Sequence, residues 1–150
     1  VEVFPCLEEL SIKLCPKLTT VPSHFPCLKK LDIAFVKSSL PLAKICSSNL
    51  TTLTDLNIIG VSELTCLPDG LLLNNKYLAR LHIGHCPLLT HIVPHVRGCG
   101  LYLRSLLIDN CEKLRDLPDG LQTLSSLETL RVTDCNDLMI SFPDGLQGLH

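Results

Sequence analysis

Six leucine-rich segments recur along the 150-residue chain at intervals of 21 to 25 residues. They begin at Leu7, Leu28, Leu53, Leu78, Leu103 and Leu127, and all but the second follow the template L-x-x-L-x-[IV]-x-x-[CV]-x-x-L. Leucine fills 33 positions, whereas the chain contains four phenylalanines, two tyrosines and no tryptophan. One apolar residue type at a fixed period indicates a single packing position that is used repeatedly.

This period and this template are the signature of leucine-rich repeats. They predict an α/β solenoid, a leucine-rich-repeat horseshoe of about six repeats. We expect short parallel strands on its concave side and irregular or 3₁₀ segments on its convex side. Residues 1–150 are interpreted as one leucine-rich-repeat domain, which we expect to be a fragment of a longer chain.

Each repeat alternates apolar and polar residues over a short stretch, as in Leu10-x-Ile12 and Leu56-x-Ile58. A period of two predicts a strand that buries these residues on one face and turns the intervening ones outward. Three positions after the second buried residue the chain should turn inward again, which predicts a buried ladder of Cys15, Val36, Val61, Cys86, Cys111 and Cys135.

The return path of three repeats carries Pro-Asp-Gly-Leu, at residues 68–71, 118–121 and 143–146. Proline fixes φ and glycine allows positive φ, so this motif predicts a turn into the convex side. The second repeat lacks the motif and has an unexpected Pro41, and we therefore expect irregular structure between Phe35 and Asn49. Either a functional excursion or a drifted repeat accounts for such a segment.

Several classes of function find no support in the sequence. A net charge of −2 with scattered Lys and Arg is not typical of a nucleic-acid-binding protein. No P-loop, dinucleotide-binding fingerprint or G-x-S-x-G motif occurs. We therefore expect no enzyme activity, no catalytic residues and no cofactor, and no apolar run is long enough for a membrane span.

The number of cysteines, nine, does not by itself distinguish a reducing from an oxidising compartment. Four of them, Cys15, Cys86, Cys111 and Cys135, occupy ladder positions, where a small thiol is easily buried and donates weakly to a carbonyl. The others lack the paired spacing of disulfide-linked end caps, so free thiols and a cytoplasmic location are expected. Asn49 begins a glycosylation sequon, which matters only for a secreted chain.

The fourth repeat concentrates histidines and cysteines in a spacing that resembles a metal site: His82, His85, Cys86, His91, His95 and Cys99. Strand alternation, however, sends His82 outward and Cys86 inward, and His91 and His95 belong to the return loop. We favour solvated histidines over a zinc site and expect no metal.

The predicted concave face is the best candidate for a binding surface, because extended concave surfaces are what solenoids offer to partners. An apolar strip of Phe35, Ile59 and Leu107, rimmed by Arg80, Arg104 and Arg131, suits a protein partner. The alternative is that these residues only keep the sheet soluble. The full set of candidate partner-binding residues is Lys30, Asp32, Phe35, Asp55, Asn57, Ile59, Arg80, His82, His85, Arg104, Leu107, Asp109, Arg131 and Asp134.

Three stretches, C-P-K-L-T-T-V-P, C-E-K-L-R-D-L-P-D-G-L-Q-T-L-S-S-L and C-N-D-L, follow the L-x-x-L-x-[IV] strands. In this combination the chain resembles the C-terminal repeats of plant intracellular nucleotide-binding leucine-rich-repeat disease-resistance proteins, especially the coiled-coil class. The resemblance covers essentially the whole chain, is fairly specific at residues 111–127 and is weakest in the second repeat.

The resemblance implies a cytoplasmic module of plant defence that recognises a pathogen effector or a guarded host protein. It also implies that the repeats help to restrain the receptor by contacting its nucleotide-binding domain, which lies outside this sequence together with any nucleotide dependence.

Two other classes of leucine-rich-repeat protein remain as alternatives. The substrate-recruiting subunit of a ubiquitin ligase also has a ladder cysteine, but its repeats continue C-x-x-[IL]-[ST]-D-x-G-[LI] instead of C-x-x-L-x-x-L-P-D-G-L. An extracellular receptor ectodomain would have L-x-G-x-I-P turns and paired capping cysteines. Nothing in the repeats separates a sensor from a scaffold.

Overall fold

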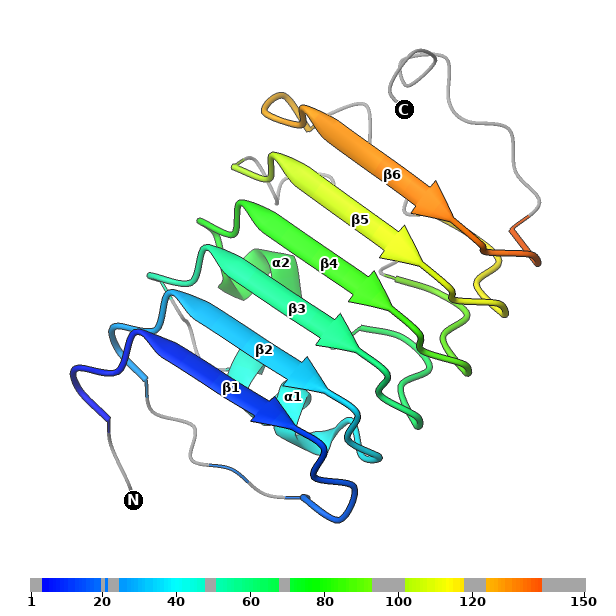
Figure 1. Cartoon of the computed structure of the whole chain (residues 1–150). Coiled ribbons are helices and arrows are strands. Elements are labelled where there is room, and N and C mark those ends of the chain that lie inside the picture. Colours follow the sequence, from blue (N-terminus) through cyan, green and yellow to red (C-terminus); the bar gives the residue numbers. More distant parts are fainter. Residues whose placement is uncertain are drawn as a thin grey trace.

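The computed structural model describes residues 4–19, 21, 25–47, 51–67, 71–92, 102–117 and 124–138. Within these ranges the chain forms a parallel six-stranded sheet whose strands pair in chain order. Figure 1 shows the strands stacked as one ribbon with the helices behind it. The predicted solenoid with short parallel strands is confirmed. The strands are β1 (Glu9–Lys13), β2 (Lys30–Ala34), β3 (Asp55–Ile59), β4 (Arg80–Gly84), β5 (Ser105–Asp109) and β6 (Thr129–Thr133).

All five strand pairs are in register, so equivalent positions of successive repeats lie side by side. Leu31 of β2, for example, pairs with Leu10 of β1 and with Leu56 of β3. Each strand is five residues long and starts 21 to 25 residues after the one before it. The sheet therefore converts the sequence repeat directly into rows of equivalent side chains that run across the strands.

The second and fourth residues of each strand point into the core, as the alternation of apolar residues predicts. In the inner strands these leucines and isoleucines are at most 3% exposed, with Ile58 and Ile83 at 0%. Those of β1 are only partly buried, because an edge strand has a neighbour on one side alone. The core is thus a stack of identical layers, each completed by the layers next to it.

Directly after each strand the backbone takes a left-handed turn. The residue at this point has a φ between 50° and 64° in all six repeats, and only one of the six is a glycine. In the first five repeats its N–H donates to the carbonyl of the last residue of the next strand, as in Phe35 to Ile59 at 2.8 Å and His85 to Asp109 at 3.0 Å. The left-handed residues are Leu14, Phe35, Gly60, His85, Asn110 and Asp134.

This turn sends the following residue inward, into the ladder. Val36, Val61, Cys86 and Cys111 are at most 1% exposed. Each ladder thiol lies within hydrogen-bonding distance of the carbonyl two residues before it, at 3.3 Å for Cys86 and 3.4 Å for Cys111. The two end positions differ from the expected buried ladder, because Cys15 is exposed and Cys135 is half-buried beside the edge strands.

The second repeat contains helix α1 (Leu40–Ser47), so the expectation of irregular structure between Phe35 and Asn49 is wrong for these residues. Pro41 does not break this helix, because it lies in the first turn, where a proline leaves no hydrogen bond unmade. Ser38 Oγ accepts a hydrogen bond from Leu40 N at 3.1 Å, and Ser39 O accepts one from Ala43 N at 3.0 Å.

The third repeat uses a single helical turn, α2 (Leu71–Asn74), at the same place on the back of the sheet. It follows the first Pro-Asp-Gly motif, whose residues 68–70 lie outside the described part of the chain. The motifs at 118–121 and 143–146, Asn49, His95 and Cys99 also lie outside it. Among the described residues no helix is long and apolar enough to cross a membrane.

The ladder position accepts either valine or cysteine in this chain, and we expect it to tolerate the exchange. Replacing Cys86→Val should cost less than about 1.5 kcal/mol of unfolding free energy, since Val61 already fits the equivalent site. The carbonyl of Gly84 keeps its hydrogen bond from Gly60 N at 2.8 Å. Truncating Ile83→Ala in the same repeat should cost about 2 to 5 kcal/mol. Urea titrations would measure both, and equal losses would contradict the interpretation of the ladder.

Candidate functional site

One face of the sheet is free of helices and carries the first, third and fifth residue of every strand (Figure 1). We call this the open face, and it corresponds to the predicted concave surface. Because the strands are in register, these residues form three rows across the sheet. What the face can bind depends on which of these side chains are already engaged with one another.

Charged residues in neighbouring strands often have opposite sign and pair within the sheet. Arg80 Nη1 lies 3.0 Å from Asp55 Oδ1, and Lys30 Nζ lies 3.9 Å from Glu9 Oε1. Just before the strands, Lys29 Nζ lies 2.9 Å from Glu8 Oε1, and this hydrogen bond raises the pKa of Lys29. Such exposed pairs add little stability, but they make these charges less available to a partner.

The carboxylate of Asp109 is held above the backbone of the neighbouring strand. A side chain at Gly84 would collide with Asp109 Oδ1, so the glycine provides the space that this oxygen occupies. The oxygen is buried, makes no hydrogen bond with the part of the chain that the structure describes, and lies 3.6 Å from His82 Nε2. A histidine and an aspartate on strands β4 and β5 therefore face each other across the open face.

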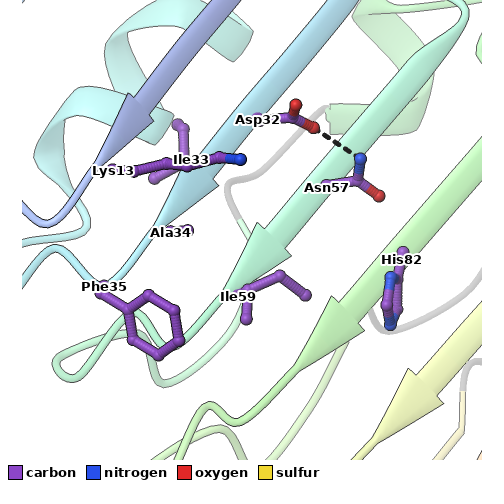
Figure 2. Close-up of a pocket in the computed structure, with 8 residues that line it drawn as sticks. All are labelled: Lys13, Asp32, Ile33, Ala34, Phe35, Asn57, Ile59 and His82. Carbon is purple, nitrogen blue, oxygen red and sulfur yellow. Dashed lines mark hydrogen bonds between the residues drawn. The ribbon is translucent and has the colours of Figure 1, made fainter.

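A hollow of about 350 Å³ lies on the open face above β2 and β3. Figure 2 shows Ala34 at its floor, with the ring of Phe35 and the side chain of Ile59 on one side. On another side Asn57 Nδ2 donates to Asp32 Oδ1. The hollow exists because Ala34 is small where the two neighbouring strands carry Lys13 and Ile59 at the same position. Lys13, Ile33 and His82 complete its lining.

The left-handed turn positions the aromatic wall of the hollow. Phe35 has a φ of 55°, and the residue is 52% exposed on the open side of the sheet. Its ring lies against Gly60 of the next repeat, where an added Cβ would come within 2.7 Å of the ring. A phenylalanine in this backbone region is uncommon and costs about 1 to 2 kcal/mol. The fold itself asks only for a residue that tolerates positive φ.

The structure separates the predicted strip. Phe35 and Ile59 line the same hollow, whereas Leu107 lies on β5, in register with His82 and Arg131, and does not line it. The three arginines of the predicted rim do not share a row. Arg80 is the first residue of β4, Arg104 precedes β5, and Arg131 is the third residue of β6.

The remaining candidate residues fall into four groups by position. Lys30 and Asp55 are first residues of their strands, Asp32, Asn57 and His82 are third residues, and Asp109 is a fifth residue. His85 and Asp134, like Phe35, follow their strands in the left-handed turn and are not part of a strand.

Sequence reasoning missed the small residues that shape this surface, Ala34 and Gly84. They carry no chemistry that a motif search detects, and their effect depends on which larger side chains lie beside them. It also missed the left-handed turn, although Gly60, Asn110 and Asp134 at equivalent positions were a usable signal, because these residue types favour positive φ.

The ladder thiols differ in pKa, and the hydrogen bond with the Cys111 thiol lowers the pKa of Cys86. The neighbouring Cys86 thiol and burial together raise the pKa of Cys111, and burial also raises the pKa of Cys135. A raised pKa keeps a thiol protonated and unreactive near neutral pH. No cluster of three or more potential metal ligands occurs among the described residues. His91, one of the histidines with metal-like spacing, instead has its Nε2 atom 3.7 Å from Asp116 Oδ2.

The chain is distantly similar to a probable disease resistance protein of Arabidopsis thaliana. The two are 28% identical over 158 aligned positions, which include 92% of this chain but only 9% of the Arabidopsis protein. The chain therefore spans about a tenth of the length of that relative. No family model and no solved structure matches the chain.

The contact between Gly84 and Asp109 gives a test of how the open face is built. We expect Gly84→Ala to lower the unfolding free energy by about 1 to 3 kcal/mol, because the new methyl group displaces the Asp109 carboxylate. In an Asp109→Ala background the same substitution should cost about 1 kcal/mol less. A double-mutant cycle by thermal or urea unfolding measures this coupling, and strictly additive losses would contradict the packing described here.

Proposed function

We propose that this chain is the protein-recognition module of a plant intracellular immune receptor, and that it acts by binding and not by catalysis. The observation that carries the proposal is the hollow on the open face, lined by Phe35 and Ile59. The distant similarity to a plant disease resistance protein supplies the biological context.

The hollow suits a side chain of a protein partner. Its floor and one wall are apolar, at Ala34, Ile59 and Phe35, and its other walls are polar, at Asp32 and Asn57. Protein interfaces place their strongest contacts where an anchor residue fills such a depression and surrounding polar groups exclude water. Sites for small ligands are more enclosed, since they bury most of the ligand surface.

The partner classes that fit the proposal are a pathogen effector, a host protein guarded by the receptor, or the receptor's own nucleotide-binding domain. Binding to the last of these would restrain the receptor. A cytoplasmic location agrees with the free thiols of Cys6, Cys15, Cys27, Cys66, Cys86, Cys111 and Cys135. The proposal requires neither an enzyme activity nor a cofactor of this chain.

Filling the hollow should abolish partner binding. Ala34 is a fifth strand residue that points to the open face, so Ala34→Arg places a long side chain in the hollow without entering the core. In proximity labelling from leaf tissue, we expect the amount of specific protein partners recovered with this variant to fall about tenfold or more relative to the unsubstituted chain.

The matched control is Thr133→Arg, at the same position of β6, where the residue is exposed and outside the hollow. It should keep its partners. Thermal unfolding of both purified variants checks that each is folded. Equal partner sets for the unsubstituted chain and Ala34→Arg would refute the hollow as the recognition site.

The restraining role has a separate test. Deleting these repeats from the receptor that we infer to carry them should cause leaf cell death without a pathogen, because an autoinhibitory contact is removed. Ion leakage from leaf discs measures this response. Absence of cell death with an abundantly expressed deletion variant would argue against restraint and leave recognition alone.

A further inference from the structure

We propose a second docking surface at the N-terminal ends of the strands, opposite to the ends that form the hollow. It is formed by Lys76, Tyr77, Tyr102 and Arg104, and it binds an acidic segment of a partner protein. We call it the tyrosine edge. The residues lie just before strands β4 and β5, whereas the hollow lies at the far ends of β2 and β3. The two ends of a five-residue strand are about 17 Å apart, so the two surfaces are distinct.

The two tyrosines form an exposed aromatic pair. Their ring centroids are 5.0 Å apart with an angle of 43° between the rings, and the residues remain 47% and 55% exposed. They are the two tyrosines of the whole chain, which has no tryptophan. Tyrosine and arginine are among the residue types that most often dominate binding at protein interfaces, and tyrosine buries a large area at a low cost in side-chain entropy.

The fold does not require tyrosine at these positions. The equivalent residues in other described repeats are Cys6, Cys27, Thr52 and Ser126. Thr52 even serves the backbone here, since its hydroxyl donates to Leu28 O at 2.7 Å. Two repeats therefore carry large aromatic side chains at a place where smaller ones satisfy the solenoid.

The backbone beneath the pair is fixed before any partner binds. Tyr77 lies in a turn closed by a hydrogen bond from Leu78 N to Asn75 O at 3.1 Å. Asn75 is fully buried, and its Nδ2 donates to Leu71 O at 2.6 Å. After Tyr102, Arg104 N donates to Ala79 O at 2.7 Å. Such preorganisation lowers the entropy cost of binding.

The charges beside the pair favour an acidic partner. Lys76 and Arg104 are exposed and make no ion pair with any residue that the structure describes. Asp55, a nearby acid, is already paired with Arg80. Glu128 lies next to Arg104 in the stack without an ion pair between them, so the edge keeps a positive excess. Carboxylates of a partner would form ion pairs with Lys76 and Arg104.

The chain provides its own reporter for the test. Because both tyrosines lie in the edge and tryptophan is absent, the intrinsic fluorescence of the chain, measured with peptides that contain neither Tyr nor Trp, reports on this surface. A display library of random twelve-residue peptides is selected for binding to the chain. Peptides that also bind the variant Tyr77→Ser/Tyr102→Ser are then removed. Serine is chosen because Thr52 and Ser126 occupy the equivalent positions in the same fold.

We expect the surviving peptides to be enriched in Asp and Glu and to shield the tyrosines from acrylamide quenching. Their affinity should fall about tenfold or more in the double tyrosine variant and severalfold in Arg104→Ala. The matched control Arg115→Ala removes an exposed arginine beyond the other end of β5 and should leave affinity unchanged.

Three outcomes would overturn the proposal. One is that no peptide distinguishes the chain from the double tyrosine variant while circular dichroism shows both folded. Another is that the selected peptides carry no excess of acidic residues. The third is that a twelve-nucleotide oligouridine shields the tyrosines as well as the peptides do, which would make the edge a site for single-stranded nucleic acid.

Discussion

The left-handed turn after each strand organises the rest of the molecule. In five of the repeats the N–H of the turn residue donates to the last carbonyl of the next strand, as Gly60 does to Gly84. This bond fixes the register between neighbouring repeats and reverses the chain so that the following residue enters the ladder. It also leaves the turn residue's own side chain outside. The buried ladder residues and the exposed side chains of the turn thus depend on the same backbone conformation.

In-register stacking then decides what the open face can offer. Equivalent positions become neighbours, so two like charges in successive repeats would repel each other, and the chain instead alternates their sign, as at Asp55 and Arg80. Many charges that look available in the sequence are used within the sheet. What remains for a partner is where side chains are unusually small, as at Ala34, or unusually large and apolar, as at Phe35.

The repeat template predicted the strands, their order and their buried faces, because both depend only on a local period of two within a fixed longer period. Helix α1 could not be predicted in this way, since the second repeat departs from the template and Pro41 suggested a break. The hollow was equally hidden. It results from Ala34 lying between Lys13 and Ile59, and this neighbourhood exists only once three repeats are stacked.

The positions that depart from what the fold needs are the ones that point to function. A left-handed turn is best served by glycine or asparagine, yet Phe35 occupies one at a cost in backbone strain and keeps half of its surface exposed. Tyr77 and Tyr102 likewise replace residues as small as serine. In a repeat protein every position has its equivalents in the same chain, and these show what folding alone requires. Tyr77 and Tyr102 are large exposed side chains that their equivalents lack, so they need an explanation outside folding, and binding to a partner provides one.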